Sequence, residues 1–253
     1  MKKIVLTSLA LSSLLLAEVP EVKLNLKESD KLTASANLGY VQTAGNTETT
    51  TYSIDAKVKK GFNKHLFELS LDGQYASQKV EGIEDETKNK YLVELEYNYE
   101  VTPKFAFGYL VGFKQDQFSG FDYQAYTGPG AKYKVIEGEI HNLSIKGNIL
   151  YARDKYETPV ESNTAINEYS SFRAQAVYNY KVTTNLAFTQ ELTYRTDLAD
   201  TAQYFVNSKS ELKSKISDKM TAGLSYKIDY ANEVATGIEH TDRTLSLTVG
   251  IDY

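Results

Sequence analysis

The sequence contains no cysteine and no tryptophan, and it has only four prolines and two methionines among its 253 residues. Without cysteine the chain has no disulfide framework, no thiolate metal ligand, no cysteine nucleophile and no acylated cysteine anchor. The formal net charge of -5 comes without a clustered basic stripe, which argues against a nucleic-acid partner. Beyond the first 17 residues, no apolar run is long enough to form a transmembrane helix.

The N-terminus has the order of a secretory signal. Two lysines precede an apolar run from Ile4 to Leu16, which ends at the small residue Ala17. The run is shorter than the ~20 residues of a membrane-spanning helix and has no polar face, which argues against an uncleaved anchor or an amphipathic helix. We therefore expect a signal peptide over 1–17, a periplasmic N-terminal segment over 18–30 and one domain over 31–253.

The rest of the chain alternates between apolar and polar residues. The pattern is clearest in the final segment, TLSLTVGIDY, whose apolar side chains occupy every second position from Leu245 to Tyr253. Successive side chains of a strand point to opposite faces, so this period predicts strands, whereas a helix would scatter the same residues around its axis. Similar segments of about 10 to 12 residues repeat from Lys31 onward, separated by Gly, Asn, Asp, Pro and Lys clusters.

About twelve such segments can be counted. They include an opening strand from Leu32 to Gln42 and a weaker one from Ala202 to Ile216, in which Ser208, Ser210 and Ser214 occupy the face expected to be apolar. An even number suits a single-chain bacterial barrel. The sequence thus predicts an all-β fold, a transmembrane antiparallel β-barrel of about 12 strands.

Two features favour a barrel in lipid over a soluble sandwich or a lipocalin-like barrel, which would bury the same apolar stripe in a core. Backbone groups in hydrocarbon must pair internally, and only a closed barrel lets strands do so without an edge. Aromatic residues also gather at the strand ends, as in the interface girdles of membrane barrels. They are Tyr40, Tyr75, Tyr99, Phe105, Tyr151, Tyr180, Tyr194, Tyr230 and Tyr253.

Connection lengths predict the orientation. Barrels of this class keep short turns in the periplasm and longer loops outside. Both termini are therefore expected in the periplasm and the protein in the cell outer membrane. The short connections are 61–65, 102–104, 137–139, 182–185 and 217–219, and the longer ones include 79–86, 154–165 and 231–240.

Four segments resemble a known family: TAGNTETTTYSIDA, FKQDQFSGFDYQAYTGPGAKYKV, LAFTQELTYR and HTDRTLSLTVGIDY. They resemble the DUF481 family, whose members are also described as YdiY-like or salt-induced outer-membrane proteins. The resemblance spans roughly 31–253, and its more specific parts are GN followed by hydroxyl residues, and FSG followed by an aromatic residue, Asp and Tyr. It implies an outer-membrane location and brings no established activity or catalytic residues.

The polar faces of the predicted strands would line a lumen with charges of both signs. One hypothesis is a narrow channel with a charged lumen for small solutes. The alternative is a non-conducting structural or stress-related envelope barrel, whose charges pair across the interior and plug it. Side chains fill the interior of barrels with about eight strands, and barrels with about sixteen have an open channel. A barrel of about twelve strands is therefore compatible with both hypotheses. The residues expected to set the selectivity of a conducting lumen are Lys114, Arg173, Arg195, Lys227, Glu94, Glu96 and Glu191, and the same inner rows hold Asp55, Lys57, Glu68, Asp72, Lys132, Lys146, Lys209, Glu211, Lys213 and Asp229.

No enzyme activity, metal site or cofactor is expected. An outer-membrane phospholipase is also a twelve-strand barrel, but it needs a histidine beside a serine. Here His65 and His141 lie beside short turns and His240 lies in a loop, without an HDSNG-like segment. Phe118 and Phe121 flank a Ser-Gly pair, and they would form a ligand platform or an inward constriction, or else a tight turn packed by its own rings.

The expected partners follow from the location. They are outer-membrane lipid and lipopolysaccharide, together with the assembly machinery during biogenesis, and the mature protein is expected to be a monomer. Tyr253 ends the chain in an alternating strand, which resembles the terminal aromatic signal that this machinery reads. We expect it to serve both assembly and anchoring at the membrane interface.

Overall fold

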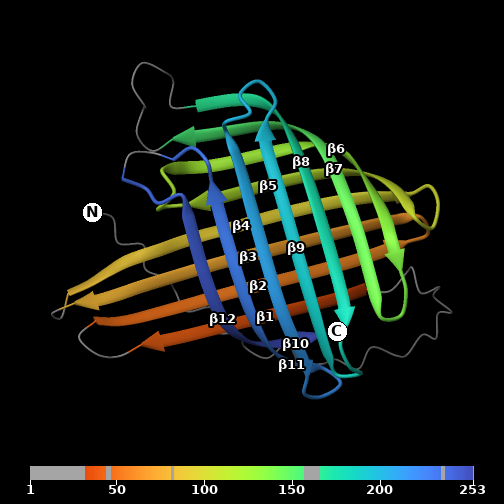
Figure 1. Ribbon diagram of the computed structural model, residues 1–253, viewed down its shortest axis with the longest axis horizontal. Coiled ribbons are helices and arrows are strands. Elements are labelled where there is room, and N and C mark those ends of the chain that lie inside the picture. Colours follow the sequence, from red (N-terminus) through yellow and green to blue (C-terminus); the bar gives the residue numbers. More distant parts are fainter. Residues whose placement is uncertain (1–31, 44–46, 81–82, 157–165, 235–236, 253) are drawn as a thin grey trace, which may run out of the picture.

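The computed structural model describes residues 32–43, 47–80, 83–156, 166–234 and 237–252. Over these residues the chain forms twelve strands and matches the predicted fold class (Figure 1). The signal peptide, the 18–30 segment and Tyr253 lie outside the described residues. The strands are β1 (Leu32–Thr43), β2 (Thr47–Phe62), β3 (His65–Val80), β4 (Ile83–Glu100), β5 (Phe105–Asp116), β6 (Phe121–Glu137), β7 (His141–Tyr156), β8 (Ile166–Lys181), β9 (Leu186–Asp197), β10 (Tyr204–Lys215), β11 (Met220–Ala231) and β12 (Thr241–Asp252).

Every strand pairs antiparallel with its neighbours in sequence, and β1 also pairs with β12, which closes the barrel. The closing seam is the shortest pairing. Only Ser35–Gly39 of β1 and Thr248–Asp252 of β12 are in register, which gives five residue pairs. The other neighbouring strands share eleven or more. The seam is therefore the weakest part of the hydrogen-bonded wall.

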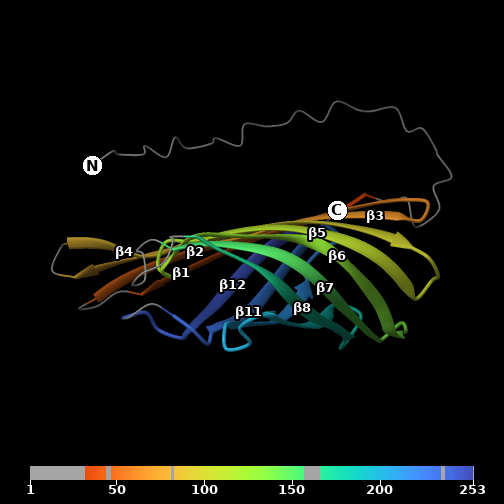
Figure 2. The same cartoon turned by 90° about the horizontal axis from the view of Figure 1, so that it is seen from above.

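The barrel is flattened in cross-section. Seen from above, β1–β4 form one wall, and β11 and β12 lie on the opposite side (Figure 2). In the first view β9–β12 cross steeply in front of β1–β4 (Figure 1). Because the walls cross at close range, side chains of β2, β3 and β4 reach those of β10, β11 and β12 through the lumen.

The end of the barrel that carries the short β2–β3, β4–β5, β6–β7, β8–β9 and β10–β11 connections is called the turn end, and the opposite end the loop end. The β2–β3 turn has only two residues, and Asn63 in it adopts a positive φ of 54°. A two-residue hairpin turn requires such a conformation, which asparagine tolerates better than most residues. The short predicted connections thus correspond to real turns.

One predicted loop is wrong. Residues 79–86 were expected to form a long polar loop, but β3 continues to Val80 and β4 begins at Ile83. Lys79 pairs with Glu84 and Ser77 with Glu86, after a register shift between Ala76 and Ser77. Strand pairing uses backbone groups alone, so it can continue beyond the apolar belt where both faces carry polar side chains.

The register of the doubtful β10 is clear in the structure. Lys209 stands opposite Glu191 on β9 and Lys227 on β11, so it belongs to the inner row of charges. Ser208 and Ser210 consequently lie in outer rows, where Gln190 donates to Ser208 Oγ at 3.0 Å. The polar residues on this outer face therefore satisfy one another.

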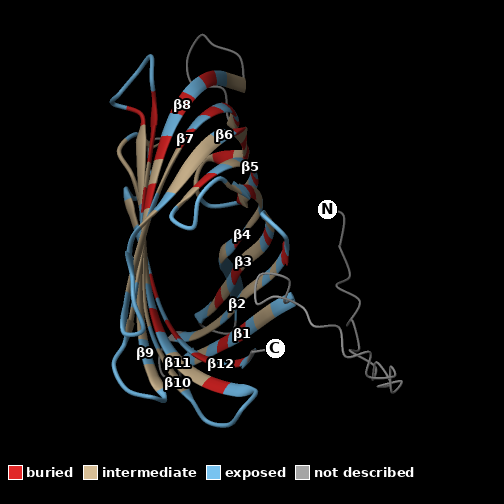
Figure 3. Ribbon diagram, turned by 90° about the vertical axis from the view of Figure 1, so that its right-hand side faces the viewer, coloured by how far each residue is buried: buried red, intermediate tan, exposed pale blue. Residues whose placement is uncertain are grey.

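A small apolar cluster fills part of the interior, which the sequence analysis did not predict. It lies on the inner faces of β5–β8, with Leu92 of β4 packed against it, and consists of Leu110, Tyr126, Leu150, Ala152 and Tyr169. The Tyr126 ring lies over Gly112, where a Cβ would come within 2.2 Å of it. This cluster partly fills that side of the lumen. Figure 3 colours the ribbon by burial, and buried residues occur along β5–β8.

Among the described residues, no helix is long and apolar enough to cross a membrane.

Candidate functional site

The outer surface of the barrel is apolar between two belts of aromatic side chains. At the turn end, His65 stacks with Tyr97 and contacts Tyr99, and His141 stacks with Tyr178 and Tyr180. At the loop end the contacts run through Tyr40, Tyr52 and Tyr75, through Tyr91, Phe113 and Tyr123, and through Tyr194, Tyr204 and Tyr230. Aromatic rings with a polar edge favour the boundary between hydrocarbon and water.

The spacing of the two belts fits a bilayer. Tyr91 and Tyr99 lie on the outer face of the same strand, and their eight residue steps span roughly 26 Å before the tilt of the strand is considered. Between the belts, Leu69 and Leu95 are 47% and 48% exposed and Leu247 is 63% exposed. A soluble protein rarely exposes a continuous apolar surface of this kind.

The lumen holds a cavity of about 350 Å³ that takes residues from strands β2 to β11. All seven charged residues that the sequence singled out line it. Cationic side chains outnumber acidic ones in the lining, although the whole chain is acidic. The cations are Lys57, Lys59, Lys90, Lys114, Lys132, Lys146, Arg173, Arg195, Lys209 and Lys227, and the acids are Asp55, Glu68, Asp72, Glu94, Glu96, Glu191 and Asp229.

Opposite walls are joined through the lumen by ion pairs. Towards the loop end, β4 meets β11 through Lys90 and Asp229, β10 meets β2 through Lys209 and Asp55, and β11 meets β3 through Lys227 and Asp72. Here too, Thr244 Oγ1 of β12 donates to Gln74 Oε1 of β3 at 3.1 Å. These contacts narrow the lumen to the spaces between paired side chains.

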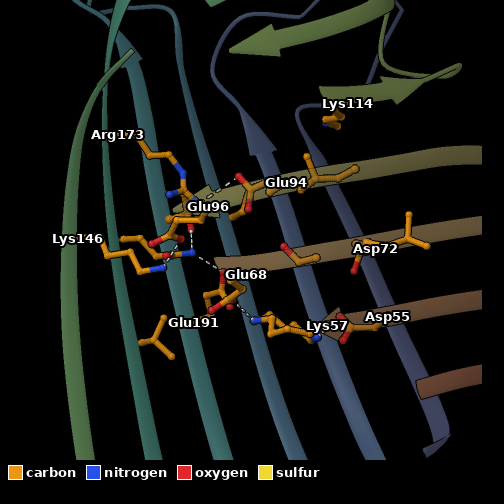
Figure 4. A pocket seen from close by; sticks show the side chains of 18 of the residues that line it. Asp55, Lys57, Glu68, Asp72, Glu94, Glu96, Lys114, Lys146, Arg173 and Glu191 are labelled. Atoms are coloured by element: carbon orange, nitrogen blue, oxygen red, sulfur yellow. Dashed lines mark hydrogen bonds and ion pairs between the residues drawn. The ribbon is translucent and has the colours of Figure 1, made fainter. Parts of the chain in front are cut away.

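Side chains of β4 also meet those of β7 and β8 inside the barrel (Figure 4). Arg173 Nη2 lies 3.4 Å from Glu94 Oε1, which also accepts a 2.7 Å hydrogen bond from the Tyr126 hydroxyl. Lys146 Nζ lies 2.5 Å from Glu96 Oε2. Lys146 reaches β4 across β5 and β6, where Gly108 and Gly130 carry no side chains of their own and the side chains of Asn98 and Asn148 lie against them.

Arg195 is held more tightly than expected for a residue that sets selectivity. Its guanidinium lies over the rings of Tyr126 and Phe205, at 5.2 Å and 4.6 Å from their centroids. It donates to the Tyr169 hydroxyl at 3.2 Å, and that hydroxyl donates to buried Asp154 at 2.8 Å. This network fixes one side of the lumen, so Arg195 lines the cavity mainly as a structural cation.

The remaining predicted charges divide into paired and less constrained groups. Glu191 accepts a 2.6 Å hydrogen bond from Gln175, and Lys114 lies 3.6 Å from Asp116 on its own strand. Lys59 and Lys90 were missed by the sequence analysis. Both could have been predicted, because each continues the alternation of its strand. For Lys90 the pattern is obscured by the apolar Leu92, which lies between Lys90 and Glu94 in the same inner row.

Phe118 and Phe121 do not form an exposed platform. Phe121 begins β6, is 6% exposed and packs against Tyr156 and Phe205 at centroid distances of 4.8 Å and 6.3 Å. Phe118 lies in the β5–β6 turn, where Asp116 Oδ1 accepts from its amide and Gly120 has a φ of 79°. Phe121 contacts Phe205 of the cavity lining, which favours the inward constriction over the platform.

The ring nitrogen Nδ1 of each histidine contacts a tyrosine hydroxyl or a backbone oxygen. Nδ1 of His65 lies 2.8 Å from the Tyr97 hydroxyl, and Nδ1 of His141 lies 2.9 Å from the Tyr178 hydroxyl. Nδ1 of His240 lies 2.9 Å from the backbone oxygen of Ala231. Within the described part of the chain, no group of three potential ligands is placed to hold a metal ion.

A family model described as "Protein of unknown function, DUF481" matches residues 36–253. None of the curated proteins matches the sequence. Among solved structures, the NanC porin is 12% identical and superposes with a TM-score of 0.51 over 88% of this chain and 99% of that one. The COG4313 outer membrane channel from Pseudomonas putida F1 is 9% identical, with a TM-score of 0.49 over 91% of this chain and 99% of that one. The likeness to the NanC porin shows that the two proteins share a barrel fold.

Proposed function

The chain belongs to the DUF481 family, and we propose that it is an outer-membrane barrel that acts as a narrow channel for small charged solutes. The observation that carries this proposal is the charged cavity inside a closed barrel whose outer surface is apolar. A barrel that only anchors loops does not require a charged cavity, whereas rows of fixed charge along a channel select ions and polar solutes.

Location in the outer membrane is part of the proposal. It is supported by the two aromatic belts and by the closed wall, which leaves few backbone groups unpaired in hydrocarbon. We place the turn end in the periplasm and the loop end outside, in contact with lipopolysaccharide. The protein would insert as a monomer with the help of the assembly machinery, which would recognise Tyr253, the residue after Asp252 in the sequence.

Planar-bilayer recording of the refolded protein tests the channel. We expect small, discrete current steps, because the ion pairs across the lumen leave only narrow gaps for hydrated ions. Folding and insertion must be verified on the same sample by heat-modifiable mobility on a gel. Silence of a folded, inserted protein at every salt concentration would reject conduction.

A non-conducting structural barrel is the second candidate, and one observation favours it. The ion pairs Lys90–Asp229, Lys209–Asp55 and Lys227–Asp72 tie the two walls together, as expected of a plug. In that case the charges stabilise a flattened barrel and carry no ions. The recording separates the two candidates directly.

A further inference from the structure

The cations of the lumen are unevenly distributed. Four lysines, here called the lysine cluster, lie around two carboxylates in the half of the lumen nearer the turn end. The lysines are Lys57 and Lys59 of β2, Lys132 of β6 and Lys146 of β7, and the carboxylates are Glu68 of β3 and Glu96 of β4. The cluster therefore has two positive charges more than it has negative ones.

Both carboxylates of the cluster are fully engaged. Glu68 places one oxygen 3.3 Å from Lys57 Nζ and the other 3.2 Å from Lys59 Nζ. Glu96 places Oε2 at 2.5 Å from Lys146 Nζ, while its Oε1 accepts from Asn98 at 2.7 Å. Each carboxylate oxygen of the cluster thus already has a partner.

Lys132 is the cation left over. Among the residues that the structure describes, no carboxylate lies within 4.0 Å of its ammonium group. Lys132 stands directly opposite Lys146 on the neighbouring strand, and Lys59 adds a second repulsion, whereas Glu96 and Glu68 attract Lys132 from beyond 4.0 Å. Two like charges facing each other across a strand pair are unfavourable unless something neutralises them.

The lumen cavity leaves room for a ligand. Lys132 lines this cavity of about 350 Å³ together with Lys57, Lys59 and Lys146. A second hollow at the turn end also includes Lys132, with Asn98 and Lys134, but its volume of about 10 Å³ is too small for an anion. An anion would therefore reach Lys132 from the lumen, on the side away from Lys134.

We propose that the lysine cluster is a binding site for a small oxyanion, such as a phosphate, sulfate or carboxylate group, centred on Lys132 and shared with Lys146 and Lys59. The ammonium groups would supply several charge-assisted hydrogen bonds, and the anion would relieve the repulsion between the facing lysines. This inference rests on the proposed function only in that the lumen is open to water.

Calorimetric titration of inorganic phosphate into the full chain, refolded in a zwitterionic detergent at low ionic strength, tests the site. We expect saturable one-site binding that Lys132→Met weakens at least about tenfold. Lys134→Met removes the same charge from the same strand, but Lys134 already has Glu137 at 3.4 Å and Glu100 at 3.8 Å. That control should bind phosphate within about twofold of the unmodified chain.

Glu96→Gln provides a change in the opposite direction. It frees Lys146 from its carboxylate, so phosphate should bind more tightly. Unsaturable heats in the unmodified chain, or equal losses in Lys132→Met and Lys134→Met, would overturn the proposal. Binding is measured without current, so phosphate binding by a silent barrel rejects only the channel, and conduction without phosphate binding rejects only the site.

Discussion

Single ion pairs in the lumen differ from those on the surface in how much water surrounds them. Glu94 is joined to Arg173 and Tyr126, and the side chains of Arg173 and Glu94 are 6% and 17% exposed. Glu94→Gln leaves the Arg173 guanidinium in the lumen without its counter-charge. We expect the free energy of unfolding to fall by about 3 kcal/mol, as is usual when one partner of a buried pair is removed. Urea unfolding in lipid vesicles measures it.

Glu48→Gln is the matched control. Glu48 lies 3.9 Å from Lys79, and the two side chains are 52% and 49% exposed. Exposed pairs contribute below about 1 kcal/mol, so this variant should unfold almost like the unmodified chain. Similar small losses in both variants would show that water fills the lumen and screens Glu94 from Arg173.

The sequence places residues on a face but does not choose their partners. Alternation alone puts Glu94, Glu96 and Arg173 on the inner face, where the structure has them. It cannot tell that side chains of β7 and β8 reach across β5 and β6 to β4, because that depends on the shape of the cross-section. The surplus cation Lys132 emerges only after every carboxylate has been assigned.

The seam between β1 and β12 has little tolerance for added volume. A Cβ at Gly250 would lie 2.2 Å from Asn37 Oδ1 and 2.8 Å from Thr221 Oγ1. We expect Gly250→Ala to force these side chains apart and to lower the free energy of unfolding by roughly 1–3 kcal/mol, with a lower folded yield. Heat-modifiable mobility after refolding gives the yield.

Gly147→Ala serves as the comparison for the seam. Gly147 also lies within a strand, but the nearest atom to its added Cβ is Phe172 Cε2 at 3.9 Å, an ordinary contact. Its folded yield should match that of the unmodified chain. If the two glycine variants fold equally well, the seam is not tightly packed and the register of β1 with β12 needs revision.

Two adjacent residues of β3, one on each face of the strand, provide a test of membrane embedding. Leu69 points outward and is 47% exposed, whereas its neighbour Ser70 lines the cavity. Leu69→Arg should destabilise the inserted barrel by about 2–4 kcal/mol, the usual cost of a cation on the lipid face. Ser70→Arg should cost clearly less, because its head group can reach water and Glu94 on the adjacent strand. Equal costs in vesicle unfolding experiments would argue for a soluble barrel.

At the scale of the strand, the alternating period predicted where strands lie but not how far they continue. Segment 202–216 was doubtful because serines replaced apolar residues, yet β10 forms, since Lys209 pairs into the inner row and the serines bond to Gln190. The sequence predicts a loop over 79–86 because polar and apolar residues do not alternate there. Alternation reveals a strand only where one face is apolar, and the hairpin arms beyond the aromatic belt are polar on both faces.

For the molecule as a whole, closure and strand number followed from the sequence, whereas the shape of the cross-section did not. A round twelve-strand barrel would leave its inner charges far apart. In the flattened barrel, β2–β4 and β10–β12 face each other closely enough for lysines and aspartates to meet. The apolar cluster around Leu110 and Leu150 fills the other side. Ions crossing the lumen would pass between the ion-paired walls and the apolar cluster, along the surplus cations.

That path predicts the sign of the selectivity. Because cations outnumber acids in the lining, the reversal potential under a salt gradient should indicate a preference for anions. Replacing Lys114 and Lys132 with Met removes two of the less constrained cations and should shift the reversal potential toward cation preference. Arg195 is a poor choice for this experiment, because its loss would also disturb Tyr169 and Asp154.

The dependence on salt distinguishes a selective lumen from a leak. Fixed charges act over a Debye length that falls from ~10 Å at 0.1 M to ~3 Å at 1 M, so the difference between the unmodified chain and the double variant should shrink as salt rises. A leak around a misinserted barrel would show neither anion preference nor a response to the two substitutions. Cation preference in the unmodified chain would mean that the surplus lysines lie off the conduction path.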